Sequence, residues 1–150
     1  MSASHYVKMM LDMIFGMDNF RNEIVWCYTS GGASKNSFSW KHDVLFRYSK
    51  GKNCLFNTQT YKRYALIEKG KEVGFDPRVE YFKDEFGTYR INIAVDWWTD
   101  IGIISPNSKS ERLGYPTQKP EKLLERIILA SSNPKDLMDK GDLICQHLIM

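Results

Sequence analysis

The stretch that decides the fold of this chain reads GYPTQKP at residues 114–120 and continues as EKLLERIILASS at residues 121–132. Prolines on both sides of the Thr-Gln-Lys tripeptide restrict its backbone, so we expect an extended loop that presents polar side chains. Apolar residues then recur at helical spacing, which predicts an amphipathic helix that begins near the second proline. The start of a helix, where backbone N–H groups point outward, is a suitable place for an anionic ligand group.

The rest of the chain alternates short helical and extended patterns. Ser2 or Ser4 is a suitable N-cap for a first helix, and Gly16 is a suitable stop for it. Alternating or continuous apolar runs bounded by turn formers predict strands. The Trp-Trp pair at residues 97–98 is expected to pack in a core, because large aromatic rings dominate core energetics. The expected elements are a first helix that ends near Phe15, with an apolar stripe of Tyr6, Val7, Met10, Met13 and Ile14, strands over 23–28, 43–48 and 87–93, and a short basic helix over 61–72.

Composition excludes several classes of protein. Apolar residues make up 43% of the 150 residues and aromatic residues 13%, which is typical of a globular domain. No run has the length of a membrane helix, and the N-terminal residues lack a signal-peptide pattern. Three cysteines and three isolated histidines show no metal-ligand spacing, so we expect reduced thiols, a cytoplasmic protein and no metal site.

The net charge of +3 is unevenly distributed. Between Lys41 and Lys71, eight lysine and arginine residues stand against two carboxylates, and the aromatic residues Tyr48, Phe56, Tyr61 and Tyr64 are interleaved with them. Basic side chains interleaved with aromatic rings are typical of a surface that follows phosphates and stacks on bases. A solvated face with ordinary core aromatics is the alternative interpretation.

Several segments resemble one known family. The sequence RLGYPTQKP at residues 112–120, with LLERII at 123–128, closely resembles the cofactor-side segment of DNA amino-methyltransferases, which modify adenine N6 or cytosine N4 in restriction-modification systems. Residues 4–26 resemble the helix and strand that follow the catalytic motif of this family, and residues 41–50 resemble a later core strand. The resemblance is to the subgroup whose catalytic motif precedes the target-recognition region and whose glycine-rich cofactor loop comes last.

The resemblance implies an α/β fold: part of a Rossmann-like S-adenosylmethionine-dependent methyltransferase with an inserted target-recognition region. Residues 1–52 would then be the core segment after the catalytic motif, 53–110 the target-recognition region and 111–150 the cofactor-flanking segment. The family motif places Thr117, Gln118 and Lys119 at the cofactor, near its methionine moiety. With the basic segment, the resemblance also implies contacts with double-stranded DNA. The expected DNA-binding residues are Lys35, Lys41, His42, Arg47, Lys50, Lys52, Lys62 and Arg63.

Two motifs of the family do not occur in these 150 residues. One is the Pro-Pro-aromatic sequence that grips a flipped base, and the other is the glycine-rich cofactor loop, whose close backbone approach requires glycine. We therefore expect no catalytic residue here, weak or absent binding of S-adenosylmethionine by the isolated chain, and a truncated methyltransferase with a complementary methyltransferase fragment as a second partner. The expected parent activity is methyl transfer to the exocyclic amine of adenine, less favourably of cytosine. A DNA-binding or partner-binding remnant without catalysis is the alternative.

Overall fold

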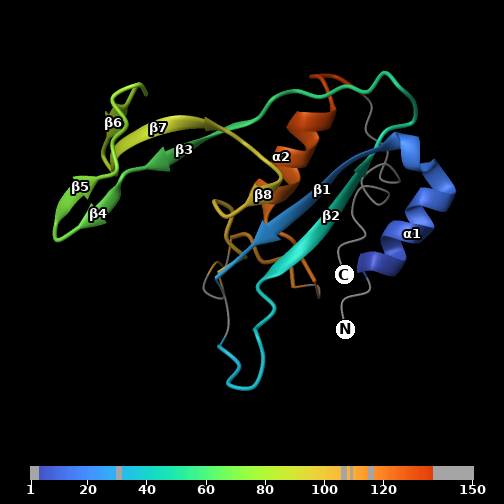
Figure 1. The fold of residues 1–150 in the computed structure, drawn as a ribbon, viewed down its shortest axis with the longest axis horizontal. Helices are drawn as coiled ribbons and strands as arrows, with labels where there is room; N and C mark the ends of the chain where they lie inside the picture. The colour runs from blue at the N-terminus through green and yellow to red at the C-terminus, as the bar shows by residue number, and fades with distance from the viewer. Residues whose placement is uncertain (1–3, 30–31, 106–107, 109, 115–116, 137–150) are drawn as a thin grey trace. The chain divides into compact units, whose positions relative to one another are not determined.

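The computed structural model describes residues 4–29, 32–105, 108, 110–114 and 117–136, which form a mixed α/β protein (Figure 1). The chain divides into two compact units, one drawn from residues 1–57 and 95–150 and the other formed by Thr58–Ala94. The second unit lies inside the stretch 53–110 that the sequence predicts to recognise the target. Within the described residues, neither helix is long and apolar enough to cross a membrane.

The first unit is built on a three-stranded sheet with the strand order β2-β1-β8. Strand β1 (Phe20–Cys27) follows a short 3₁₀ helix, η1 (Met17–Asn19), and pairs antiparallel with β2 (His42–Tyr48). On its other edge β1 pairs in parallel with β8 (Trp97–Trp98). The strands predicted over 23–28 and 43–48 are confirmed, although β1 begins three residues earlier and ends one residue earlier than predicted.

Helices pack on both faces of this sheet. Because side chains alternate along a strand, Trp26 shares a face of the sheet with Ile24, whose cross-strand partner is Leu45, while Phe46 belongs to the other face. The first face packs against Leu123 of α2 (Glu121–Ser131). The second packs against α1 (Ser4–Phe15), which lies beside β1 and β2 in Figure 1. The helix expected to end near Phe15 and the helix expected after Pro120 are therefore both confirmed.

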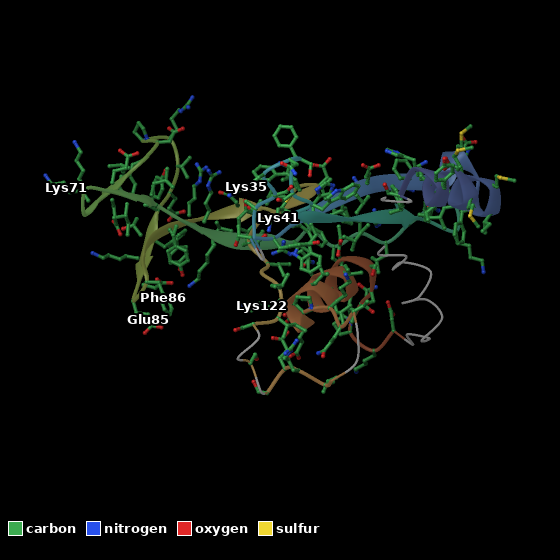
Figure 2. All side chains as sticks on the ribbon, turned by 90° about the horizontal axis from the view of Figure 1, so that it is seen from below. Lys35, Lys41, Lys71, Glu85, Phe86 and Lys122 are labelled. Atoms are coloured by element: carbon green, nitrogen blue, oxygen red, sulfur yellow. The ribbon has the colours of Figure 1, made fainter. Side chains whose placement is uncertain are left out.

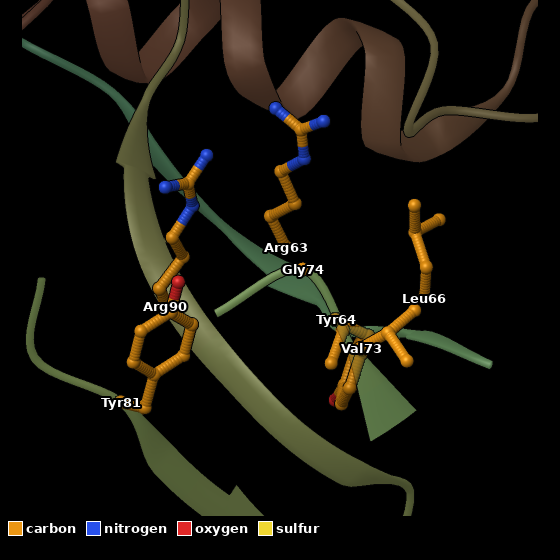
Figure 3. Close-up of a pocket in the computed structure, with 8 residues that line it drawn as sticks. Arg63, Tyr64, Leu66, Val73, Gly74, Tyr81 and Arg90 are labelled. Atoms are coloured by element: carbon orange, nitrogen blue, oxygen red, sulfur yellow. The ribbon is translucent and has the colours of Figure 1, made fainter. Parts of the chain in front are cut away.

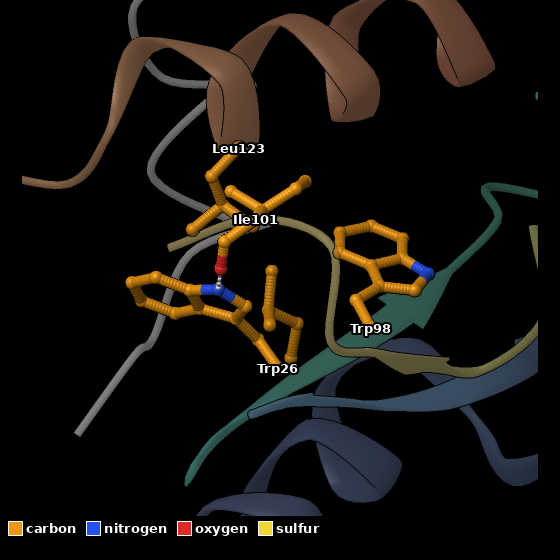
Figure 4. Packing of buried hydrophobic residues seen from close by; sticks show 5 residues of the cluster. Trp26, Trp98, Ile101 and Leu123 are labelled. Carbon is orange, nitrogen blue, oxygen red and sulfur yellow. Dashed lines mark hydrogen bonds between the residues drawn. The ribbon is translucent and has the colours of Figure 1, made fainter. Parts of the chain in front are cut away.

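The centre of the first unit is a cluster of five buried side chains, seen in Figure 4: Trp26, Leu45, Trp98, Ile101 and Leu123. Leu123 is fully buried, and Trp26 is 2% exposed. The indole Nε1 of Trp26 donates to the carbonyl oxygen of Ile101 at 2.7 Å, so burial leaves no unpaired polar atom on this ring. The packing prediction is correct for Trp98 and wrong for Trp97, which is 55% exposed, because neighbouring strand residues face opposite ways.

Helix α1 ends where Gly16 adopts a positive φ of 83°, as the sequence predicts. Its predicted apolar stripe is wrong in four of five positions, since only Val7 of that stripe is buried. The buried line instead joins Val7, Leu11 and Phe15, spaced four residues apart, and packs on Phe46 of β2. The other four stripe residues are exposed: Tyr6, Met10, Met13 and Ile14.

The second unit contains only strands. The expected helix over 61–72 is wrong, because Tyr61 and Tyr64 have side chains that suit an extended pleat and Lys69-Gly70 forms a tight turn. Both turn residues have positive φ, 50° and 75°, as a two-residue hairpin turn requires. The strand predicted over 87–93 is confirmed. The strands are β3 (Thr60–Tyr64), β7 (Gly87–Ile93) and β6 (Phe82–Asp84) in one sheet, in the order β3-β7-β6, and β4 (Leu66–Glu68) with β5 (Lys71–Val73) in another.

We predict that Leu123→Ala lowers the free energy of unfolding by about 2–5 kcal/mol, because it removes a fully buried side chain from the central cluster. Leu129→Ala is the matched control, since Leu129 lies on the same helix and is 50% exposed. Urea unfolding followed by tryptophan fluorescence measures both variants. Equal losses for the two variants would contradict this position of the core.

A polar cluster joins α1 to the end of β2. Lys8 Nζ bonds both carboxylate oxygens of Asp12 at 2.7 Å, and the Tyr48 hydroxyl donates to Asp12 Oδ1 at 2.7 Å. These bonds, from Lys8 first and then from Tyr48, hold the pKa of Asp12 below its ordinary value of 3.8. The same cluster raises the pKa of Lys8, chiefly through Asp12, while burial is the main cause of the raised pKa of Tyr48.

This cluster makes the stability of the first unit depend on pH in a defined way. A carboxyl whose pKa is depressed on folding contributes stability above its unfolded pKa and loses it as the pH falls through the folded value. Asp12→Asn is therefore expected to destabilise the protein at neutral pH, and the difference from the unsubstituted protein should close below pH 3.8. Urea unfolding over a pH series tests this, with the exposed Asp18→Asn as the control. A difference that persists in acid would contradict the role of the Asp12 charge.

Candidate functional site

The predicted loop brings Lys119 to the carboxyl end of β1, the end at which ligands bind when neighbouring strands are parallel, as β1 and β8 are. Lys119 Nζ donates to Oδ2 of Asp43, near the start of β2, at 2.7 Å, and lies 5.4 Å from the centroid of the Trp26 ring. The side chains of Lys119 and Asp43 are only 23% and 16% exposed. The structure thus places a half-buried ion pair at this edge of the sheet.

Asp43 also accepts a hydrogen bond from the hydroxyl of Tyr28 at 3.3 Å. Burial, followed by the nearby Asp43 charge, raises the pKa of Tyr28, so this hydroxyl stays protonated and remains a donor at neutral pH. The Tyr28 and Trp26 rings lie 5.1 Å apart and enclose this side of the site. No sequence pattern pointed to Asp43 or Tyr28, because their contact with Lys119 is created by packing between residues distant in the chain.

The loop around Gln118 is held by its own side chains. The Gln118 amide donates to the carbonyl oxygen of Glu111 at 2.6 Å and accepts from the N–H of Leu113 at 2.8 Å, so this side chain shapes the loop. Glu111 in turn accepts from the N–H of Glu121, the first residue of α2, at 2.9 Å. A carboxylate of the chain itself thus stabilises the helix start, as the helix dipole favours. Thr117 is exposed, with a φ of 64° that is rare for a β-branched residue.

Three of the expected DNA-binding residues lie in the connection from β1 to β2 or at the first residue of β2, close to the Lys119–Asp43 pair in the chain or in space. Lys35 is exposed, Lys41 donates from Nζ to the carbonyl oxygen of Gly32 at 3.1 Å, and His42 is an exposed first residue of β2. Figure 2 shows that Lys35 and Lys41 come from the same loop. The structure therefore brings these three residues to the same end of the sheet as Lys119.

Three more of the expected DNA-binding residues, Arg47, Lys50 and Lys52, lie toward the other end of β2. The Arg47 guanidinium stacks on Phe56 at 4.7 Å and donates to the carbonyl oxygen of Leu55 at 2.9 Å, so it anchors the segment after the strand. Lys50 and Lys52 are exposed on the turn that follows. That turn is fixed by a residue that no sequence pattern indicated: Arg21 donates to Ser49 Oγ at 2.8 Å and to the Gly51 carbonyl oxygen at 2.9 Å.

The last two, Lys62 and Arg63, lie on β3 of the second unit and face opposite sides of its sheet, because they are consecutive strand residues. Lys62 Nζ is paired with Asp84 at 2.6 Å and lies 4.3 Å from the centroid of the Tyr89 ring. The sequence treats the two cations alike, but the structure distinguishes them by their partners.

In the part of the chain that the structure describes, no group of His, Cys, Asp and Glu side chains is arranged to hold a metal ion.

A comparison with protein families gives one decisive match: the family model described as DNA methylase aligns with residues 1–143. This chain belongs to the DNA methylase family. The loop of residues 117–120, the ion pair and both helices all lie within the matched range. The resemblance found at residues 112–128 is therefore confirmed for the family as a whole, that of the DNA amino-methyltransferases.

Individual relatives of this chain support the assignment to the family. The chain is 30% identical to the type II methyltransferase M.HpaI of Haemophilus parainfluenzae over 95% of its own length and 42% of the relative. It is 31% identical to the DNA adenine methyltransferase YhdJ of Escherichia coli K12, with 79% of its length and 39% of the relative covered. It is also 31% identical to the type II methyltransferase M1.MboII of Moraxella bovis, over 79% of its length and 48% of the relative. The chain thus spans less than half the length of these relatives. No solved structure matches it.

We predict that Asp43 and Lys119 stabilise the fold jointly. Asp43→Asn and Lys119→Met should each lower the free energy of unfolding, and a double-mutant cycle should give a coupling energy of about 1 kcal/mol, as expected for a half-buried pair. Methionine keeps the apolar stem beside Trp26, so the cycle isolates the charge. Urea unfolding of the four proteins measures it, and strictly additive effects would contradict the ion pair.

Proposed function

We propose that this DNA methylase takes part in transferring the methyl group of S-adenosylmethionine to the exocyclic amine of adenine in DNA, with cytosine as the less favoured target. The observation that carries the proposal is the Lys119–Asp43 pair, at the carboxyl edge of parallel strands and on the loop whose sequence resembles the family's cofactor segment. The adenine target is supported by the relative named a DNA adenine methyltransferase.

The residues at this edge fit the amino-acid end of S-adenosylmethionine. That end carries one carboxylate and one ammonium group, and the protein offers an ammonium on Lys119 beside a carboxylate on Asp43. In the proposal Lys119 holds the cofactor carboxylate and Asp43 the cofactor ammonium, since charge-assisted hydrogen bonds are the stronger kind. The exposed hydroxyl of Thr117 adds a donor, and Gln118 keeps the loop in shape. The cofactor itself supplies an activated methyl group.

The fold is consistent with a part of a larger enzyme. We place the first unit in a Rossmann-like sheet, because α1 and α2 cover opposite faces of strands that include a parallel pair. The second unit, Thr58–Ala94, is the proposed target-recognition region, inserted within the expected limits 53–110. Residues 1–52 and 111–150 keep their proposed roles as core and cofactor-flanking segments.

DNA is the proposed partner of the cations at the edge of the first unit. Lys35, Lys41 and His42 share the sheet end of Lys119, so a duplex bound there would lie next to the cofactor. A base must leave the helical stack before its amine can react, and a Pro-Pro-aromatic segment is the expected grip. The five prolines of this sequence include no adjacent pair, so we propose that a complementary methyltransferase segment supplies that grip.

Isothermal titration of the whole chain with S-adenosylmethionine tests the cofactor site. We expect weak binding, with a further loss of about tenfold in Lys119→Met, since one charge-assisted hydrogen bond is worth about 1.5–3 kcal/mol. Lys122→Met, a change in an exposed residue of α2 three positions further along the chain, is the control. Binding that is unaffected by Lys119→Met would contradict the assignment of this loop to the cofactor.

Methyl transfer is tested with isotopically labelled S-adenosylmethionine and mixed-sequence duplex DNA, followed by mass spectrometry of the nucleosides. Production of N6-methyladenine supports the proposal, and N4-methylcytosine would overturn the choice of adenine. Transfer by these 150 residues alone would overturn the need for a complementary segment. Binding of DNA without any binding of S-adenosylmethionine would favour the non-catalytic alternative.

A further inference from the structure

The second unit carries two arginines directly opposite each other. Arg63 of β3 and Arg90 of β7 are partners in the antiparallel register, flanked by the Lys62–Ile91 and Tyr64–Tyr89 pairs. Side chains of such partners leave the same face of the sheet, with their Cβ atoms about 4.5–5.5 Å apart. Figure 3 shows both guanidinium groups projecting the same way from their strands. The two positive charges are thus held together by the backbone register.

The charge of this pair is not neutralised by an ion pair. Among the described residues, no carboxylate forms an ion pair with the guanidinium of Arg63 or of Arg90. The pKa of Asp76 is lowered first by its hydrogen bonds with Arg78 and only last by the charge of Arg90. Both carboxylate oxygens of Asp76 accept hydrogen bonds from the Arg78 guanidinium, Oδ1 at 3.0 Å and Oδ2 at 2.9 Å. Like charges directly opposite each other destabilise a sheet, so this pair opposes folding unless an anion is present.

The contrast with Lys62 separates a structural cation from an available one. Lys62 lies on the other face of β3, where Asp84 neutralises it and Tyr89 covers it. Arg63, the next residue, is exposed and has no such partner. These two adjacent cations of β3 therefore differ in role: Lys62 helps to hold the sheet together, and Arg63 faces outward.

The two arginines line a pocket together with tyrosines. Its lining includes Arg63, Arg90, Tyr64, Tyr81 and Val73. The Tyr81 hydroxyl accepts from the N–H of Asp76 at 2.9 Å and donates no hydrogen bond in the described part of the chain, which leaves its proton for a ligand. Two planar guanidinium forks and one hydroxyl donor make a set of donors that matches the oxygens of a phosphate group.

We propose that Arg63 and Arg90 together hold one backbone phosphate of bound DNA, with Tyr81 as an additional donor. This inference rests on the proposed function, because that function names DNA as the substrate whose phosphate groups the arginines would bind. Phosphate contacts position a protein on a duplex without reading its sequence. Arg63 and Arg90 are thus positioning residues, and they set the register of the second unit on the DNA.

The experiment measures binding of the whole chain to a short, fluorescently labelled mixed-sequence duplex by anisotropy, over a series of salt concentrations. The slope of log affinity against log salt falls by about 0.9 for each phosphate contact that is lost. We expect a slope reduced by about one unit in the Arg63→Gln, Arg90→Gln double variant, and about tenfold weaker binding at low salt. Arg63→Lys should keep the slope, because it keeps the charge.

Lys71→Gln is the control, since it removes one positive charge, as each arginine substitution does, from an exposed strand position of the same unit outside the pair. It should leave the slope unchanged. Thermal unfolding adds a second readout. Because the double variant removes a like-charge contact, its Tm should equal or exceed that of the unsubstituted chain.

The outcomes separate this inference from the function on which it rests. If the unsubstituted chain binds no DNA, the proposed DNA substrate is wrong. If the unsubstituted chain binds DNA with normal salt dependence but the double variant keeps the full slope, only the phosphate assignment is overturned. A clear fall in the Tm of the double variant would also overturn it, because the arginines would then be structural.

Discussion

The structure depends on the contact between Leu123 of α2 and Trp26 of β1. Both side chains are almost completely buried, and they join elements that are about a hundred residues apart in the chain. The contact also brings Ile101 into the cluster, where its carbonyl oxygen accepts from the Trp26 indole at 2.7 Å. One hydrophobic contact thus fixes the helix, the strand and the segment after β8 with respect to one another, and the hydrogen bond removes the cost of burying the indole N–H.

The candidate site follows directly from this packing. Lys119 lies only four residues before Leu123, so the contact that buries the leucine also determines where the loop meets the sheet. The lysine then rests beside the Trp26 ring and reaches Asp43 on β2. A second constraint, the carboxylate of Glu111 on the first N–H of α2, stabilises the start of the helix. The polar pair is therefore held by apolar packing on one side and by helix capping on the other.

The sequence predicted those features that depend on short-range patterns. Helix α1, helix α2 and three of the strands follow from apolar spacing, from Gly16 and from the proline before α2. The errors arose where the pattern was ambiguous. In the segment from Tyr61 to Glu72 basic residues suggested a helix, but the Lys69-Gly70 turn, with positive φ at both residues, makes a hairpin. The exposed methionines of α1 had the spacing of a stripe but not its orientation, because the packing partner on β2 selects the face.

Partners of charged residues that are distant in the sequence could not have been predicted, since tertiary contacts choose them. The motif pointed to Lys119 but not to Asp43. Asp43 is nevertheless the carboxylate that neutralises the charge of Lys119. Arg47 was expected on DNA, yet its guanidinium is stacked on Phe56 and bonded to a backbone carbonyl. The same reasoning separates Lys62 from Arg63, which have equal charge and are adjacent in sequence. A cation that already has a carboxylate contributes little further attraction to a polyanion, because counterion release requires charge that is not neutralised locally. The distribution of carboxylates, more than that of the basic residues, therefore determines which cations remain available to the proposed DNA partner.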